Sequence, residues 1–347
     1  MAFDPMSELR DALTERLARL WGYNASDYTS LIVPDELRDH VDSVRATPVP
    51  ADIAELVTSQ MSREEEVKAF NDDSTGSLPL GARLKPRGLY EDDWAARPSK
   101  DYPWPVVLVH GTSDTNGAWE LLANDLRSQG WCVFAPAYGH RATDPVEQSA
   151  AQVGSYVDAV LAVTGAEQAI VVGHSQGGLV LRYWMSQLGG GDKVKHMICL
   201  AAPNHGTTLG GIVSPLMTNK MTANVVDSLV RVWFGPVGFQ QVVGSEVIRK
   251  TNEHGDLVPG VTYTCIATRS DAVIQPPETC FLDGDPDVVD NIWVQSLEPD
   301  AQVMHEMLPL DIRSRKLVMI ALHRVREHAG LVGPLGAADP LTDDSES

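Results

Sequence analysis

The sequence predicts an α/β protein built on a mostly parallel, doubly wound sheet. From Pro105 onward, short apolar runs alternate with longer segments of helical periodicity, which is the pattern of parallel strands covered by helices on both faces. The apolar runs are nearly continuous, as expected of strands that are buried on both sides. The pentapeptide Gly-His-Ser-Gln-Gly at 173–177 lies between one such run and a helical segment, where a sharp strand-to-helix turn is expected.

Residues 1–97 precede this alternation and are predicted to form a helical N-terminal extension. Besides a first helix near the N-terminus, helices are expected at 34–45 and 51–70. The extension is either an accessory layer packed on the main domain or an arm that binds a partner, and we favour the packed layer. Its first helix follows Ser7, a suitable N-cap, and shows helical spacing at four leucines: Leu9, Leu13, Leu17 and Leu20.

Residues 98–330 form the predicted main domain. Strands are expected at 106–110, 131–135, 168–173, 196–201, 261–267 and 291–296, and helices near 117–129, 146–163, 177–188 and 313–329. Residues 207–260 interrupt the alternation and are interpreted as an insertion that forms a helical cap or lid. Residues 331–347 are rich in Gly, Pro and Ala and then in Asp and Ser, and we expect a disordered tail.

The composition excludes several classes of partner. The chain has 347 residues, enough for one large domain with an appendage. Its 27 basic and 47 acidic residues give a net charge of −20, which argues against nucleic acid or an anionic membrane surface as a partner. No run of 18 apolar residues exists, so no transmembrane span is expected.

The N-terminal residues and the cysteines bear on the cellular compartment. The first residues, Met-Ala-Phe-Asp-Pro, lack the basic and apolar regions of a secretion signal, so we expect a cytoplasmic protein, or a secreted one if the chain begins after processing. Cys132 and Cys199 lie in apolar strand-like runs and are expected to be core residues. Cys265 and Cys280 are either free or bridged, because the sequence does not show whether their Cβ atoms approach.

Ser175 is the candidate nucleophile. Glycines two positions to either side allow the chain to turn sharply, and the turn exposes the hydroxyl. The apolar run 169–172 predicts a buried strand before the serine, and apolar positions after Gly177 predict a helix. The alternative is an ordinary Gly/Ser turn, but the strand before and the helix after favour a nucleophile.

The candidate base and acid are expected in loops that follow strands, because sites in open α/β sheets lie at the carboxyl ends of the strands. His305 follows the last predicted strand and is the expected base, with a surface loop histidine as the alternative. Asp271 follows the strand at 261–267 and is the expected orienting acid. Asp256 and Asp283 are the competing carboxylates.

The oxyanion formed during acyl transfer needs two backbone N–H donors. One is expected from Gln176, which follows the nucleophile at the start of a helix, and the other from Thr112 in the loop after the first strand. Gly111 lets this loop approach closely. His110 ends the strand and is expected to be a buried, hydrogen-bonded structural residue.

These motifs together resemble actinobacterial lipases of the α/β-hydrolase superfamily, in the group often called class 2 lipases. The matching segments are 105–112, the turn at Ser175, 202–207, and the blocks around Asp271 and His305. The resemblance implies an α/β-hydrolase fold, a Ser175–His305–Asp271 triad, hydrolysis of carboxylic esters including acylglycerols, and no organic cofactor. The chain order Ser, Asp, His is also the order of that superfamily.

The insertion provides the expected substrate-binding residues. Five apolar side chains would share one helix face, either as a lid or acyl-chain tunnel or as a cap packed on the core: Val226, Leu229, Val230, Trp233 and Phe234. The sequence contains no HExxH, CxxC or P-loop pattern, so no metal or nucleotide cofactor is expected. The sequence thus predicts a serine hydrolase of lipid-like esters, a triacylglycerol lipase or carboxylesterase that works through an acyl-enzyme. The alternatives are an acyltransferase or peptidase with the same triad, or a non-catalytic binding protein of the same fold.

Overall fold

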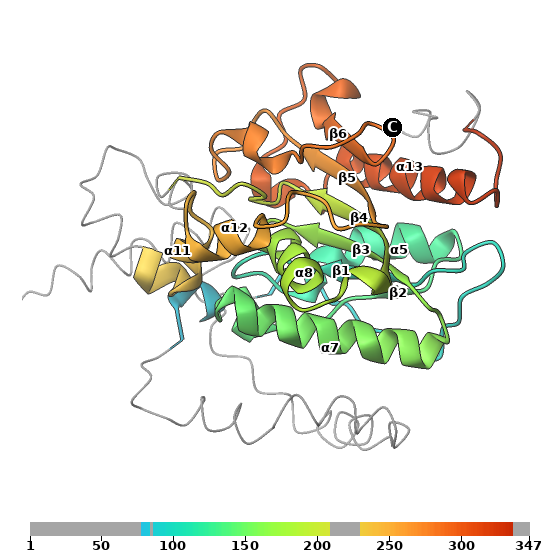
Figure 1. Ribbon diagram of the computed structural model, residues 1–347, viewed down its shortest axis with the longest axis horizontal. Helices are drawn as coiled ribbons and strands as arrows, with labels where there is room; N and C mark the ends of the chain where they lie inside the picture. Colours follow the sequence, from blue (N-terminus) through green and yellow to red (C-terminus); the bar gives the residue numbers. More distant parts are fainter. Residues whose placement is uncertain (1–77, 84–85, 209–229, 336–347) are drawn as a thin grey trace, which may run out of the picture.

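A computed structural model describes residues 78–83, 86–208 and 230–335 of the chain. Its centre is a six-stranded sheet in the order β2-β1-β3-β4-β5-β6, with every neighbouring pair parallel (Figure 1). The predicted parallel α/β architecture is confirmed. The strands are β1 Val106–Val109, β2 Val133–Phe134, β3 Ala169–His174, β4 Val194–Leu200, β5 Thr262–Ala267 and β6 Val289–Trp293.

Helices cover both faces of the sheet, because alternate side chains of each strand point to opposite sides. In β1, Val107 and Val109 belong to one core cluster, whereas Val106 and Leu108 belong to the other. The long helices are α5 (Glu120–Ser128), α7 (Val146–Thr164), α8 (Gln176–Gln187) and α13 (Ile312–His328). Side chains of α7 and α8 complete the first cluster, and side chains of α5 and α13 complete the second.

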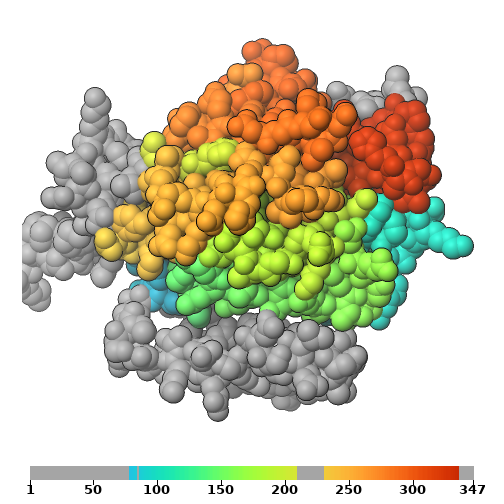
Figure 2. Space-filling view, viewed as in Figure 1, coloured from blue at the N-terminus to red at the C-terminus, as the bar shows by residue number. Residues whose placement is uncertain are grey.

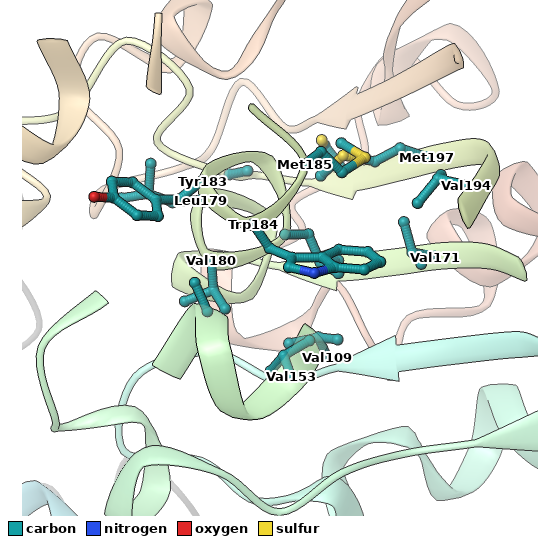
Figure 3. Packing of buried hydrophobic residues seen from close by; sticks show 14 of the residues in the cluster. Val109, Val153, Val171, Leu179, Val180, Tyr183, Trp184, Met185, Val194 and Met197 are labelled. Carbon is teal, nitrogen blue, oxygen red and sulfur yellow. The ribbon is translucent and has the colours of Figure 1, made fainter. Parts of the chain in front are cut away.

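Trp184 shows how closely the helices of the first face pack. Its indole packs against Gly154 of α7 and lies near Val171, Val194 and Met197 of the strands (Figure 3). A Cβ at Gly154 of α7 would lie 2.4 Å from Trp184 Nε1, so the two helices can approach this closely only with glycine there. Full burial of a large apolar side chain contributes about 1.5–3 kcal/mol, so this layer fixes α8, and with it the residue before α8, firmly on the sheet.

The helices lie where they were predicted, with differences at their ends. The helix expected at 117–129 begins as the 3₁₀ helix η4 (Asn116–Trp119) and continues as α5. The last strand ends earlier than expected, because its final residues form the 3₁₀ helix η8 (Val294–Ser296). The remaining short helices are η3 (Leu80–Arg83), α6 (Gly139–Ala142), η5 (Gly191–Lys193), η7 (Pro277–Cys280) and η9 (His305–Met307).

The described part of the insertion consists of short helices joined by turns. Residues 230–234 are helical, and α11 (Val237–Gln240) and α12 (Glu246–Thr251) follow. Figure 2 shows this segment, in yellow and light orange, lying against the green surface formed by α7 and α8. Gln240 of α11 fixes it there: its Nε2 donates to Glu147 Oε2 at 2.9 Å, and its Oε1 accepts from the Val146 N–H at 2.8 Å.

The helices predicted within residues 1–70 lie outside the described residues, as does the chain after residue 335. The described end of the extension packs on the domain beside β2. Tyr90 donates its hydroxyl to the carbonyl of Val133 at 2.5 Å, and Trp94 lies 5.3 Å from Phe134 between ring centres. The boundaries of the extension, of the main domain and of the tail stay predictions.

Two further expectations concern cysteines and membranes. All four cysteines are free and buried, so the bridged alternative for Cys265 and Cys280 is wrong; Cys265 instead pairs across strands with Cys199 of β4. Of the helices in the described residues, none combines the length and the apolar character needed to cross a membrane.

Candidate active site

Ser175 lies at the turn between β3 and α8 with φ 52° and ψ −128°. A positive φ is uncommon for a residue with a side chain, and such strain occurs mainly at functional positions. The glycines around it explain how the turn is possible. A Cβ at Gly177 would lie 2.2 Å from the carbonyl oxygen of Val109, and one at Gly173 would lie 2.5 Å from the nitrogen of Gly178.

Ser175, His305 and Asp271 form one hydrogen-bonded chain. Ser175 Oγ lies 2.9 Å from His305 Nε2, and His305 Nδ1 lies 2.8 Å from Asp271 Oδ2. All three residues are buried, with exposed fractions of 7%, 7% and 3% in that order. Ser175 directly follows β3, His305 begins η9 and Asp271 lies in the loop after β5. They meet because the carboxyl ends of parallel strands share one edge of the sheet.

The Asp271 carboxylate is held from both sides. Its Oδ1 accepts the backbone N–H groups of Val273 and Ile274, each at 2.8 Å, while Oδ2 accepts the imidazole N–H. This arrangement sets the tautomer of His305: Nδ1 carries the proton, and the Nε2 lone pair accepts from the Ser175 hydroxyl. This hydrogen-bonded arrangement has the geometry by which an oriented imidazole can activate a serine hydroxyl.

The environment of His305 favours its protonated form. Burial lowers the pKa of the imidazole, but the charge of Asp271 and its hydrogen bond, with a smaller contribution from Glu306, raise it by more. The net pKa is therefore above the usual value of 6.5. A histidine of this kind is a suitable acceptor for the serine proton.

The competing residues lie elsewhere. Asp256 Oδ2 is 3.1 Å from His205 Nε2 and accepts the backbone N–H of Asp283 at 2.7 Å, so the Asp256 carboxylate belongs to a different cluster.

The loop after β1 lies against the start of α8. The Thr112 hydroxyl donates to Gln176 Oε1, which joins the two residues expected to supply the oxyanion donors. Gly111 makes the approach possible, since a Cβ there would lie 3.0 Å from Ser175 Cβ and 3.2 Å from His174 Nδ1. His110 is buried and donates from Nδ1 to the carbonyl of Gly111 at 2.9 Å, as expected of a structural residue.

Sequence reasoning missed His174, the second residue of the pentapeptide. Its Nε2 donates to the backbone carbonyl of His305 at 3.0 Å, and so it holds the loop that carries the candidate base. Burial, reinforced by the neighbouring His305, lowers the pKa of His174 well below its usual value, so it is a neutral donor. The pentapeptide pattern leaves this position open, and nothing in the sequence indicates the contact.

A second missed feature is the left-handed turn of α6. Four consecutive residues from Gly139 to Ala142 have φ between 44° and 65°, which costs about 1–2 kcal/mol for each residue with a side chain. Arg141 in this turn donates to the carbonyls of Ser113 and Asp114, and its own carbonyl accepts the Ser113 N–H at 2.8 Å. The turn thereby supports the loop that carries Thr112.

Three of the expected substrate-binding residues can be placed. Val230 and Trp233 are buried, and Phe234 is half-buried. Val230 and Phe234 pack over α11, where a Cβ at Gly238 would lie 2.5 Å from Val230 Cγ1. A role in lining an acyl tunnel stays a prediction for them, and Val226 and Leu229 lie outside the described residues.

The candidate site holds one His and one Asp in contact. Within the stretches that the structure describes, no three His, Cys, Asp or Glu side chains are grouped so that they could hold a metal ion.

Comparison with known proteins places this geometry in a family. The family model described as "Alpha/beta hydrolase family" matches residues 106–340. Two curated relatives are each called "Triacylglycerol lipase". The one from Burkholderia plantarii is 29% identical over 168 residues, 46% of this chain and 45% of that protein. The one from Pseudarthrobacter phenanthrenivorans is 30% identical over 140 residues, 38% of this chain and 43% of that protein.

The match to these relatives therefore spans less than half of their length. Among solved structures, lipase B of Aspergillus fumigatus has a similar fold, with a TM-score of 0.53 at 16% identity over 90% of this chain and 85% of that one. The family match takes in the whole sheet, the turn at Ser175 and the loops that carry Asp271 and His305. On this ground the chain is a member of the alpha/beta hydrolase family.

Proposed function

We propose that the protein is a serine carboxylic-ester hydrolase that acts on lipid-like esters, as a triacylglycerol lipase or a carboxylesterase. The single observation that carries the proposal is the hydrogen-bonded chain from Ser175 through His305 to Asp271, with distances of 2.9 and 2.8 Å. The two relatives named as triacylglycerol lipases support the substrate class over the part of the chain that they match.

The proposed reaction proceeds in two steps that use the same residues. Ser175 Oγ attacks the ester carbonyl while His305 Nε2 takes the hydroxyl proton, and the protonated imidazole then gives it to the leaving alcohol. Water attacks the acyl-enzyme with His305 again as base, which releases the acid and restores the serine. Asp271 keeps the imidazole in the required tautomer and stabilises its charged form.

The backbone N–H groups of Thr112 and Gln176 are the proposed oxyanion donors. Neither N–H has an acceptor among the residues described, so both are free to bind a developing negative charge. Gln176 is the first residue of α8, where the helix dipole adds partial positive charge. Removing one such donor typically costs about 3 kcal/mol of transition-state stabilisation.

A fluorophosphonate probe tests the nucleophile directly. We expect the wild-type protein to be labelled once per chain and Ser175→Ala to be unlabelled. Labelling of the Ser175→Ala variant to the same extent would contradict the assignment.

A substrate panel tests the reaction class. We expect release of p-nitrophenol from short-chain and long-chain esters and of fatty acid from a triolein emulsion. Acyl transfer to an added alcohol in preference to water would indicate an acyltransferase, and the absence of turnover by labelled protein would indicate a different acyl substrate.

A further inference from the structure

We propose that Gln241 is a positioning residue for the oxyanion hole and acts through the side chain of Thr112. The proposal rests on the function proposed above and adds a residue from the insertion to it. Gln241 follows α11, is 5% exposed, and lies 129 positions from Thr112 in the sequence.

The polar contacts run in one direction. Gln241 Nε2 donates to Thr112 Oγ1 at 3.2 Å, and the Thr112 hydroxyl donates in turn to Gln176 Oε1. The amide of Gln241 occupies a lone pair of the hydroxyl, and so it directs the hydroxyl proton towards Gln176. The two residues whose N–H groups would bind the oxyanion are thus tied together by their side chains.

The orientation of the Gln176 side-chain amide depends on its hydrogen bond with Thr112. It is fully buried, and its Nε2 has no hydrogen-bond partner among the residues that the structure describes. The bond that Oε1 accepts from Thr112 is therefore what fixes this amide in the described part of the chain. Removing one member of a buried polar network leaves its hydrogen-bond partners unsatisfied, which costs free energy and favours rearrangement of those side chains.

Arg141 holds the loop through Ser113 and Asp114, and Gln241 and Gln176 hold it through the side chain of Thr112. Gly111 contributes no side chain, and its approach to Ser175 leaves no room for one. A misplacement of about 1 Å in a catalytic group can reduce the rate by about a hundredfold. We therefore expect the side-chain hydrogen bonds of Thr112 to affect the reaction rate.

Gln241 is held in place by its backbone. Its carbonyl accepts the Thr207 N–H at 2.9 Å, and the Thr207 carbonyl accepts the Val243 N–H at 3.0 Å. The Thr207 hydroxyl donates to the Val273 carbonyl at 2.7 Å and accepts the Gln275 N–H at 2.9 Å. Gln241 therefore links the oxyanion loop to the loop that carries Asp271.

The neighbouring residue provides a matched control. Gln240 has the same side chain, but its amide contacts Glu147 and Val146 of α7 instead of Thr112. Replacing either glutamine with methionine keeps the length of the side chain and removes the amide. The two variants lose a similar number of hydrogen bonds, and only one of them loses the contact with the oxyanion loop.

The test compares kcat and KM for p-nitrophenyl butyrate, together with thermal melting, for Gln241→Met and Gln240→Met. We expect Gln241→Met to lower kcat by about tenfold, which is less than the loss of about a hundredfold or more caused by removing an oxyanion donor. KM should change by less than about twofold. The acid limb of its pH–rate profile should be unchanged, because His305 and Asp271 keep their contacts. Gln240→Met should retain the wild-type kcat.

A double-mutant cycle separates positioning from general destabilisation. Thr112→Val removes the hydroxyl and keeps the backbone N–H, so Gln241→Met should have no further effect in that background. Multiplicative losses in the double variant would overturn the proposal, as would equal kcat losses for Gln241→Met and Gln240→Met. If Gln241→Met unfolds at too low a temperature to be assayed, Thr112→Ser and Thr112→Val provide the test. Thr112→Ser should have a kcat about tenfold above that of Thr112→Val, and equal kcat values would overturn the proposal.

The outcomes also distinguish this proposal from the proposed function. Ester hydrolysis that survives in Ser175→Ala would contradict the function, whatever Gln241 does. Hydrolysis that needs Ser175 but has the wild-type kcat in Gln241→Met would contradict the positioning role alone.

Discussion

Asp271 is the residue on which the orientation of the candidate site depends most directly. One carboxylate oxygen is committed to two backbone N–H groups, of Val273 and Ile274, and the other to His305. Each oxygen has a distinct set of donors, so the side chain cannot turn over without losing bonds. At the scale of the residue, the proposed function therefore depends on both oxygens of this side chain accepting hydrogen bonds.

Replacing Asp271 with Asn tests this dependence. If Oδ1 of the asparagine keeps the two backbone N–H groups, its Nδ2 faces His305 and donates, which forces the proton of the imidazole onto Nε2. The base is then unable to accept the serine proton, and we expect kcat for ester hydrolysis to fall by about four orders of magnitude. Asp256→Asn is the control, because that carboxylate pairs with His205 and Arg182. A near-normal kcat for Asp271→Asn would remove Asp271 from the mechanism.

The pH dependence of kcat/KM reports on His305. The base must be neutral in the free enzyme, so activity is lost as the pH falls through its pKa. The nearby acidic groups raise this pKa above 6.5 despite burial, so we expect the acid limb of the profile to lie above the usual range of histidine. Glu306→Gln removes one of these charges and should shift the limb to lower pH. An unshifted limb, or a shift to higher pH, would contradict this account.

At the scale of the element, β3 and α8 are joined as one unit that presents Ser175. The strand ends at His174, the helix begins at Gln176, and the residue between them has no freedom because backbone lies close on both sides. Glycine at 177 is required by the carbonyl of Val109 in the neighbouring strand, and not by a positive φ. The pattern of the pentapeptide thus follows from packing against β1.

Gly177→Ala tests this packing. The added Cβ would lie 2.2 Å from a backbone oxygen, so α8 or β1 must shift, and we expect a loss of about 1–3 kcal/mol in the free energy of unfolding. Because Ser175 moves with α8, labelling by the fluorophosphonate probe should slow as well. Gly333→Ala is the control, since a Cβ there would meet nothing within 4 Å. Similar stabilities for the two variants in urea unfolding would show that the junction is not tightly packed.

Much of this element structure could be predicted from the sequence, for identifiable reasons. The strands are short apolar runs that are buried on both faces, so their periodicity and composition agree, and all six were found. The contact of Ser175 with His305 could be anticipated because each residue follows a strand of the same sheet. The turn at Gly139–Ala142 could not, since it needs positive φ at residues such as Arg141 that rarely adopt it. The role of Gln241 depends on where a long insertion returns to the sheet, which local patterns do not encode.

At the scale of the whole molecule, a second polar cluster holds the insertion to the main domain. Arg182 of α8 is 3% exposed and donates to Asn252 Oδ1 at 2.7 Å and to the Asp256 carbonyl at 2.8 Å. The carboxylate of Asp256 lies 3.1 Å from His205, which follows β4. The cluster therefore joins α8, the end of the insertion and the chain after β4, on the side of the fold that carries Ser175.

The cluster should make stability depend on pH through His205. The hydrogen bond with Asp256 raises the pKa of His205 above 6.5 although burial opposes it. Burial raises the pKa of Asp256, but the hydrogen bonds from His205 and the Asp283 N–H and the nearby positive charges lower it by more, to below 3.8. A histidine whose pKa is raised by folding stabilises the folded state fully at pH values below its pKa in the unfolded chain. This stabilisation is lost as the pH rises through its pKa in the folded protein. A carboxylate whose pKa is lowered by folding stabilises the folded state fully at pH values above its pKa in the unfolded chain. This stabilisation is lost as the pH falls through its pKa in the folded protein.

The stabilising window thus lies between the lowered pKa of Asp256 and the raised pKa of His205. We expect His205→Gln to lower the free energy of unfolding at pH 5 to 6, and the difference from wild type to shrink as the pH rises past the pKa of His205. The measurement is urea unfolding at a series of pH values. His254→Gln, at an exposed histidine of the same segment, is the control for loss of an imidazole from this segment. A His205→Gln difference that is constant from pH 5 to pH 9 would mean that His205 contributes by packing alone, and a difference that grows with pH would contradict the sign of the shift.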